Sequence, residues 1–565
     1  MASIISRRGL LGGLPVAWAG MTAGIASIPR GTLGSHASPS AGQIFDIRSY
    51  GARGDGRTLD TKALQSAVDA CHQARAGVVY VPAGTFLIGT VQLKSWVTLH
   101  LAAGATLLGS SDGRDYYPAR EIPLGGVPGD ATLRDGHVGL LYAVNAENIT
   151  LEGPGTIDGQ GAEFRRGLHG APPPSGRGGG RRPFQLLLYR CRQVRVRDMF
   201  FTRGAYHCLR LVECRFAWFD NLHILNRVNG NNDGFHFISC EYAHVNGCDV
   251  LSGDDACALF GSCRNITIAN SSFSTRWSVF RFGGGTAENI TISNCILHEV
   301  YGCPIKMQCN PGARFENISF ANLLLQNVTG PIHIGNGPSP RYRRGRPPQA
   351  PAHAEVTHPG IVRNISFSHC NIRVVNPRHQ PDLLPWHIGY RSGEVHSCVA
   401  LNAMGNSWLE NISFDDVRIS YPGGGTAAMA AIRNVPEISG EYFMNGPLPA
   451  WAVYARNVRG LELANMRFEL RAADLRPALN LIHVDDGVLA NCTLAGPARS
   501  RAALRVEAAR NCLVTAPRLL APAPVFLEAA GDCRDMVVNG GDLSRAGQLL
   551  DCRDGARQSE FKVRE

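Results

Sequence analysis

Apolar and polar residues alternate in short runs along most of the chain, the pattern of half-buried β-strands. A phrase of Asn-Ile, then Ser or Thr, then an apolar residue recurs, starting at Asn148, Asn265, Asn289, Asn317, Asn364 and Asn411. From the second copy on, the steps are 24, 28, 47 and 47 residues, the last two being about twice the basic step. Self-similarity with this period predicts a solenoid in which each coil holds about three short strands.

The residues that recur at each step predict how neighbouring coils contact each other. Asparagine tolerates the left-handed backbone conformation, so the recurrent residue is expected to form a ladder of turns bonded from coil to coil. Cys191, Cys214, Cys240 and Cys263 recur at a similar step. Their spacing matches no metal site such as CxxC, and we expect small buried side chains stacked in the core.

The segment DTKALQSAVDACHQARAG predicts a helix over about 61–75, with Asp60 as N-cap and Gly77 just past its end. Its apolar stripe contains Ala63, Leu64, Ala67, Val68 and Cys71. A solenoid needs its open end covered, so this helix is predicted to cap the N-terminal end. Residues 42–565 are therefore expected to form a single all-β domain, a parallel β-helix.

The first residues read as an export signal. Arg7-Arg8 precedes an apolar run from Leu10 to about Ile28, which resembles a bacterial twin-arginine signal ending near residue 37. We expect an exported protein, periplasmic or extracellular, with no membrane contact after signal removal. The net charge of +10 is compatible with an acidic polymer as partner, and we expect no nucleic-acid partner and a monomer.

Three aspartates stand in a segment otherwise poor in charge, NNDGFHFISCEYAHVNGCDVLSGDDA. Asp233 precedes Asp254 by 21 residues, about one coil, and Asp255 follows directly. Applying the steps of the asparagine ladder places four residues in one column on one face, namely Asn231, Asp254, Ser278 and Lys306.

Three carboxylates on one face repel each other, so one is pushed to hold its proton near neutral pH. A protonated carboxyl can act as general acid while an ionised neighbour acts as base. A bound calcium ion and a plain polar surface turn are the alternative interpretations.

The chain resembles glycoside hydrolase family 28, the polygalacturonase-like right-handed parallel β-helix enzymes, over most of residues 42–490. The motifs that carry the resemblance are FDIRSYGARGDGRTLDTKALQSAVDAC (45–71), GPGTIDGQG (153–161), RPF (182–184), NNDG (231–234), SGDDA (252–256) and PIK (304–306). The resemblance implies inverting hydrolysis of galacturonate-containing pectin without a metal or other cofactor. It implies that Asp254 is the general acid, that Asp233 and Asp255 activate water, and that Lys306 holds substrate.

Two family positions differ here. Ser278 stands where the family has a histidine, and Pro304 stands where it has an arginine. Arg281 is a candidate replacement cation, although a structural salt bridge is equally compatible with its position. Trp277 is a candidate sugar platform or a packing residue. These differences weaken the expectation of plain polygalacturonic acid and leave rhamnogalacturonan open.

Two other functions remain open from the sequence. A calcium-dependent polysaccharide lyase would use a similar scaffold and release unsaturated products. A non-catalytic glycan-binding β-helix is the other alternative, because fold alone does not set function. Such a protein would gain little from three crowded carboxylates.

Overall fold

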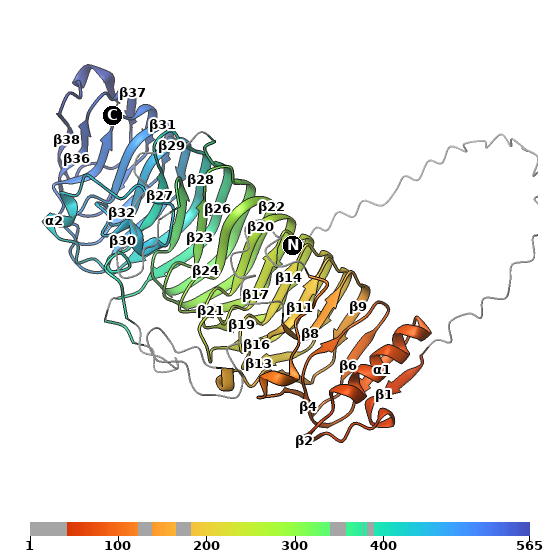
Figure 1. Ribbon diagram of the computed structural model, residues 1–565. Coiled ribbons are helices and arrows are strands. Elements are labelled where there is room, and N and C mark those ends of the chain that lie inside the picture. Colours follow the sequence, from red (N-terminus) through yellow and green to blue (C-terminus); the bar gives the residue numbers. More distant parts are fainter. Residues whose placement is uncertain are drawn as a thin grey trace, which may run out of the picture. The chain divides into compact units, whose positions relative to one another are not determined.

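The computed structural model describes residues 42–122, 138–164, 182–339, 358–376, 378–380 and 389–564. Residues 41–565 form one compact unit, so the expected export signal over 1–37 lies outside the described residues. Within the unit, parallel strands of successive coils lie beside each other (Figure 1). The right-handed parallel β-helix expected from the sequence is confirmed.

Each coil contributes to three stacks of strands, which we call the first, second and third face in the order in which the chain visits them. The first face contains β5 (Val91–Gln92), β8 (Gly139–Val144), β11 (Phe184–Tyr189), β14 (Leu209–Val212), β17 (Phe235–Ile238), β23 (Ile305–Cys309), β25 (Ile332–Asn336), β27 (Val399–Ala403), β33 (Ala502–Glu507), β36 (Ala523–Ala530) and β38 (Ala546–Arg553). The second face contains β1 (Ile44–Asp46), β3 (Val78–Val81), β6 (Thr98–Leu101), β9 (Glu147–Glu152), β12 (Arg192–Arg197), β15 (Arg215–Asp220), β18 (Glu241–Asn246), β34 (Arg510–Thr515), β37 (Arg534–Asn539) and β39 (Phe561–Arg564).

The third face contains β2 (Asp55–Leu59), β4 (Gly84–Ile88), β7 (Ala105–Gly109), β10 (Thr156–Asp158), β13 (Phe200–Thr202), β16 (His223–Asn226), β19 (Asp249–Ser252), β21 (Ser272–Thr275), β30 (Arg467–Leu470), β32 (Thr493–Ala495) and β35 (Arg518–Leu519). Long strands turn corners and serve more than one face: β20 (Cys257–Ala269), β22 (Phe280–Val300), β24 (Arg314–Val328), β26 (Ile361–Val374), β28 (Leu409–Tyr421), β29 (Val453–Ala464) and β31 (Leu479–Ala490). The site described below lies where the third face leads into the first.

Helices are few and short apart from one. The α-helices are α1 (Thr61–Ala74) and α2 (Ala427–Ala430), and the 3-10 helices are η1 (Ile47–Tyr50), η2 (Gly113–Asp115), η4 (Gly161–Phe164), η5 (Tyr442–Asn445) and η6 (Gln558–Glu560). In the ranges that the structure describes, no helix is both long and apolar enough to cross a membrane.

Helix α1 lies over the first coil, against β1, β3 and β5 (Figure 1). The five residues of its expected apolar stripe are all buried, which confirms the face that it turns toward the solenoid. The N-cap expectation needs a correction. The carboxylate of Asp60 makes no cap bond to the helix and instead accepts from the backbone N–H groups of Arg53 and Gly54, at 2.8 and 3.0 Å. The segment before β2 therefore takes the carboxylate that the N-cap expectation assigned to the helix.

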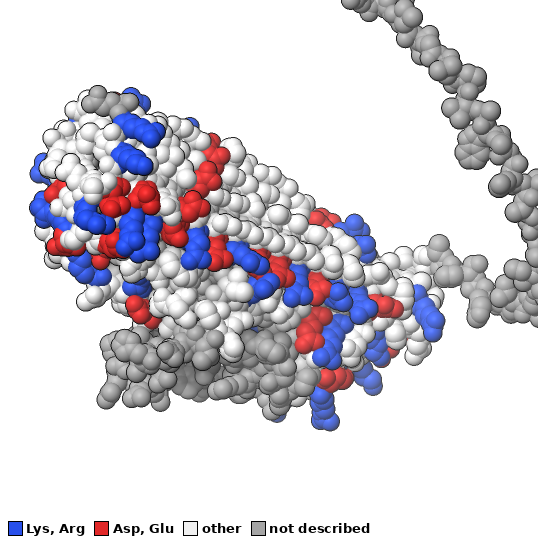
Figure 2. All heavy atoms as spheres, turned by 90° about the horizontal axis from the view of Figure 1, so that it is seen from above, with Lys and Arg blue, Asp and Glu red and all other residues white. Residues whose placement is uncertain are grey.

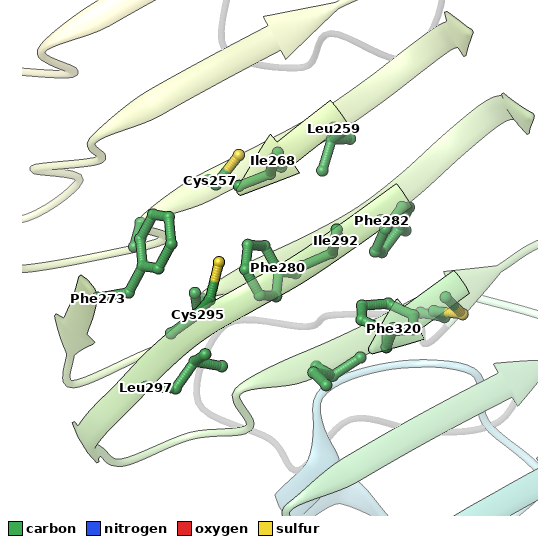
Figure 3. Close-up of a cluster of buried hydrophobic side chains, with 14 of the residues drawn as sticks. Cys257, Leu259, Ile268, Phe273, Phe280, Phe282, Ile292, Cys295, Leu297 and Phe320 are labelled. Carbon is green, nitrogen blue, oxygen red and sulfur yellow. The ribbon is translucent and has the colours of Figure 1, made fainter. Parts of the chain in front are cut away.

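The interior is a continuous stack of apolar side chains from successive coils. Figure 3 shows Phe273, Phe280, Phe282 and Phe320 turned toward one shared interior. Aromatic rings also stack directly along the solenoid. The ring centroids of Phe320 and Phe367 lie 4.8 Å apart, and those of Phe367 and Phe414 lie 4.7 Å apart. These contacts give each coil an apolar partner above and below.

The asparagine and cysteine ladders are confirmed. Asn289, Asn317 and Asn364 all have left-handed backbones, with φ of 56, 55 and 57°. The side-chain amide of each donates to the side-chain oxygen of the preceding rung, with distances of 3.2, 3.2 and 2.9 Å. The four recurrent cysteines are buried and form no disulfides.

Basic and acidic side chains alternate in a band along one side of the molecule (Figure 2). On the second face, Arg215 pairs with Glu241 at 2.6 Å and Arg264 pairs with Glu288 at 3.0 Å, in each case across two coils. Exposed pairs of this kind contribute about 0–1 kcal/mol each. The glutamates neutralise the arginines of these pairs, so these arginines are not free to bind a charged ligand.

Candidate active site

The three aspartates lie together in the turns that lead from the third face into two neighbouring strands of the first face. Asp233 immediately precedes β17, and Asp254 and Asp255 precede β20, the next strand in the stack. The backbone N–H of Gly234 donates to the carbonyl oxygen of Asp255 at 3.0 Å, so Asp233 and Asp255 sit side by side in successive coils. A spacing of about one coil therefore brings distant carboxylates into one cluster.

The three carboxylates differ in burial. Asp233 and Asp255 are 4% and 7% exposed, whereas Asp254 is only half-buried. Burial raises the pKa of Asp254 well above its usual value, and the charges of Asp233 and Asp255 raise it further, against the opposing effect of Lys306. Burial, followed by the charge of Asp255, also raises the pKa of Asp233. The most accessible carboxyl of the three is therefore one whose pKa is raised.

Two histidines surround Asp233. Nδ1 of His236 lies 2.7 Å from one carboxylate oxygen of Asp233, and Nε2 of His207 lies 3.7 Å from the other. The two imidazole rings stack with centroids 4.3 Å apart. Burial lowers the pKa of His207 well below its usual value, so this ring is neutral and its 3.7 Å contact with Asp233 is not an ion pair. Sequence reasoning missed this role, since only the three-residue step from Asp233 to His236 hinted at it.

His207, Asp233 and His236 offer ligand atoms within 4.8 Å of one another, and nitrogen and oxygen atoms of this kind bind metal ions such as zinc. The surroundings oppose a cation there. Nη1 of Arg210 lies 3.1 Å from His207, and the charges of Arg210 and Arg182 lower the pKa of that histidine. The arrangement is better suited to holding Asp233 in one orientation.

Two cations face the aspartates from the following coils. Arg281 of β22 is in register with Lys306 of β23, and its Nε lies 3.9 Å from Oδ2 of Asp255. Lys306 is 1% exposed, and its Nζ lies 5.6 Å from the ring centre of Trp277. Arg281 therefore lies beside the carboxylate cluster, and its contacts are compatible with both expectations, a replacement cation and a structural salt bridge.

The expected column is wrong in part. Lys306 is in register with Arg281 and not with Ser278, because the extra residues of the 28-residue step lie after Lys306, in the turn before β24. Ser278 is fully buried, and in the described part of the chain its hydroxyl has no hydrogen-bond partner. Its side chain therefore does not reach the surface at this site.

Asn231 and Trp277 do border the site. The side-chain amide of Asn231 donates to Oδ2 of Asp254 at 3.3 Å, and its backbone is left-handed, with φ of 55°. Trp277 is half-buried and packs edge-on to Phe443, and the guanidinium of Arg391 lies 4.4 Å from its ring centre. Both an aromatic platform and a packing role remain compatible with this environment.

One charged residue of the site was missed from the sequence. Glu441 lies in the segment between β28 and β29, and its carboxylate contacts the ammonium of Lys306. Its other oxygen lies 3.7 Å from Nη2 of Arg281. The two residues of the ion pair are 135 positions apart, and no repeat or motif marks Glu441, so only the folded chain reveals the contact.

Clustered carboxylates on a face of a parallel β-helix, one of them with a raised pKa, are the groups that hydrolysis of a glycosidic bond requires. The fold and the site together are those of a parallel β-helix protein equipped to act on a glycosidic bond. The profile of glycosyl hydrolases family 28 matches residues 71–368, more than half of the chain, and the chain belongs to this family.

Known relatives agree with the assignment. The chain is 31% identical over 215 residues to a probable polygalacturonase of Vitis vinifera, covering 37% of this chain and 43% of the relative. It is 31% identical over 268 residues to an exo-poly-alpha-D-galacturonosidase of Dickeya chrysanthemi, covering 44% and 43%. The structure of a family 28 exopolygalacturonase from Yersinia enterocolitica superposes with a TM-score of 0.55 at 17% identity, covering 80% of this chain and 78% of that one. The chain thus matches less than half the length of these two curated relatives.

Proposed function

We propose that the protein is a glycoside hydrolase that cleaves a pectin-like, galacturonate-containing polysaccharide with inversion at the anomeric carbon. The observation that carries the proposal is the cluster of Asp233, Asp254 and Asp255 on two successive coils, in which burial and the two neighbouring carboxylates raise the pKa of Asp254. Family membership and polygalacturonase-named relatives support the substrate class.

In the proposed reaction, the carboxyl of Asp254 gives its proton to the oxygen of the departing sugar as the glycosidic bond breaks. A water molecule attacks the anomeric carbon from the opposite side and gives its proton to Asp233 or Asp255. His236 and His207 hold Asp233 in place. The positive charges of Arg281 and Lys306 offset the negative charges of the carboxylates around the glycosidic bond. An inverting enzyme needs room for water between acid and base, and carboxyls on successive coils are compatible with this.

The test is product analysis with purified protein on polygalacturonan and rhamnogalacturonan oligosaccharides. We expect new reducing ends, saturated products, and first release of the anomer opposite to that of the substrate. Unsaturated products that disappear on calcium chelation would instead establish a lyase. Binding without cleavage across a broad glycan panel would establish a glycan-binding protein.

We also propose export through the twin-arginine pathway, supported by Arg7-Arg8 and the apolar run that follows. The mature chain would then act as a monomer outside the cytoplasm, on plant cell-wall polysaccharide. A fusion of residues 1–37 to a reporter should reach the periplasm of a bacterial host. Replacing both arginines with lysine should retain the reporter inside, and unchanged export would refute this route.

A further inference from the structure

The two cations of the site are already neutralised by the protein itself. Glu441 forms an ion pair with Lys306 and lies 3.7 Å from Arg281, and the side chains are 17%, 1% and 12% exposed respectively. Burial alone would raise the pKa of Glu441, but the charges of Lys306 and Arg281 outweigh it and lower the pKa to about 2. Glu441 is therefore an anion at any pH at which such an enzyme is assayed.

The segment that carries Glu441 is firmly attached to the solenoid. The side-chain amide of Gln308, on the strand that carries Lys306, donates to the carbonyl of Ser439 at 2.9 Å. The hydroxyl of Tyr442 donates to the carbonyl of Cys398 at 2.8 Å and accepts from the backbone N–H of the same residue at 2.9 Å. Ser439 and Tyr442 are 0% and 1% exposed. Glu441 is thus held over the cations from both sides.

This arrangement disfavours a second carboxylate. A uronate carboxylate on Lys306 or Arg281 would either lie against ionised Glu441 or displace it from a buried pair, and separating a buried ion pair is costly. The charges of Asp255, Arg281, Lys306 and Glu441 sum to zero when both carboxylates are ionised. A sugar without charge meets no such penalty.

The unsatisfied polar atoms at the same place match a hydroxyl group. In the described part of the chain, Oδ1 of Asp255 and Nη1 of Arg281 are both buried without a hydrogen-bond partner. A hydroxyl can donate to the carboxylate oxygen and accept from the guanidinium at once. Buried polar atoms that a protein leaves unpaired are costly, and because the charged groups of these two residues lie 3.9 Å apart, a sugar hydroxyl bound beside them would satisfy one or both.

We infer that Glu441 is a specificity-determining residue, and that the position beside Arg281 and Lys306 selects an uncharged sugar over a uronate. The inference rests on the proposed hydrolase function. The scissile bond would then join a uronate to a neutral sugar, as in a polymer that alternates the two, or would lie beside an esterified uronate.

Methyl esterification gives a sharp probe because it removes the charge of a galacturonate oligosaccharide and keeps the sugar. We expect the wild-type protein to cleave the methyl-esterified oligosaccharide, and an oligosaccharide alternating uronate with neutral sugar, with kcat/KM at least tenfold above that for the free acid. Glu441→Gln should reduce this preference at least tenfold, by improving kcat/KM for the free acid. Glu437→Gln is the matched control, because Glu437 lies on the same segment, is 56% exposed, and pairs with Arg456 and not with the site.

Binding to the Asp254→Asn protein, measured by calorimetry with the same oligosaccharides, tests the preference without turnover. If no substrate is hydrolysed by the wild-type protein yet the uncharged ligands still bind more tightly, the proposed hydrolysis fails and the selectivity stands. If the free acid is bound and cleaved at least as well as its ester, the inference is overturned. The wild-type comparison holds even if Glu441→Gln does not fold.

Discussion

Replacing Asp254 by asparagine tests the catalytic proposal and its electrostatic basis together. The substitution keeps the shape of the side chain but removes the proton to be transferred, and the amide cannot ionise. General acids contribute typically about 10²–10⁴-fold to rate, so we expect kcat to fall by at least about 100-fold. At the same time we expect the protein to become more stable at pH 7, because folding forces this carboxyl into a site that opposes its ionisation.

The stability gain should be on the order of 1 kcal/mol, the repulsion of two like charges about 4 Å apart in bulk water, because solvent screens the half-exposed side chain of Asp254. Its sign depends on pH. The pKa of Asp254 in the folded protein lies above 3.8, so the folded state binds more protons than the unfolded state above that pH, and stability falls as pH rises through this window. The advantage of the mutant should therefore be present at pH 7 and absent near pH 3.

Chemical denaturation at the two pH values, with reducing-end assays, measures both effects. Asp249→Asn is the matched control, because Asp249 is an exposed aspartate on the preceding strand, hydrogen-bonded to Ser272. A mutant that keeps a tenth or more of the activity would refute the role of Asp254 as acid. A mutant that is inactive but less stable at pH 7 would refute the reasoning about crowded carboxylates.

Three further outcomes are expected. Asn317→Ala should lower the free energy of unfolding by about 1–3 kcal/mol, because alanine is strained at φ of 55° and loses the ladder bonds, whereas Asn317→Gly should recover the strain part in denaturation experiments. Phe367→Ala should cost about 3–5 kcal/mol in the same experiment, since the ring is 1% exposed between two stacked neighbours; a loss below 1 kcal/mol would contradict the packing. Dialysis against a strong chelator should leave hydrolysis unchanged, while a loss of activity restored by zinc would assign the cluster of His207, Asp233 and His236 to a metal.

The fold could be predicted from the sequence because a solenoid repeats its local rules. The same asparagine turn, buried cysteine and apolar alternation return in many of the coils, so a period read along the chain specifies neighbours in space. The clustering of Asp233 with Asp254 and Asp255 follows from one such step. The register of Lys306 could not be predicted, because the step between rungs does not reveal on which side of a strand the extra residues lie.

Contacts made by segments outside the repeat were beyond sequence reasoning. Asp60 stands at the N-cap position as expected, but its side chain makes no cap bond, because two backbone N–H groups of the segment before β2 bind its carboxylate instead. Glu441 was missed for a related reason, since its partners lie on other coils and its own segment follows no period. Local propensity ranks such options but does not decide between them.

These differences suggest how one scaffold serves more than one substrate. The carboxylates belong to the repeat itself, where successive coils set their spacing, so the groups proposed to act in hydrolysis are held by the scaffold. Glu441 belongs to a segment added between two coils, and it reaches the site from outside the repeat. Changing that segment alters the charge presented to the substrate without moving the aspartates. Selection among sugars can therefore change while the chemistry stays, and the inserted segments are where substrate differences within such a family should be sought.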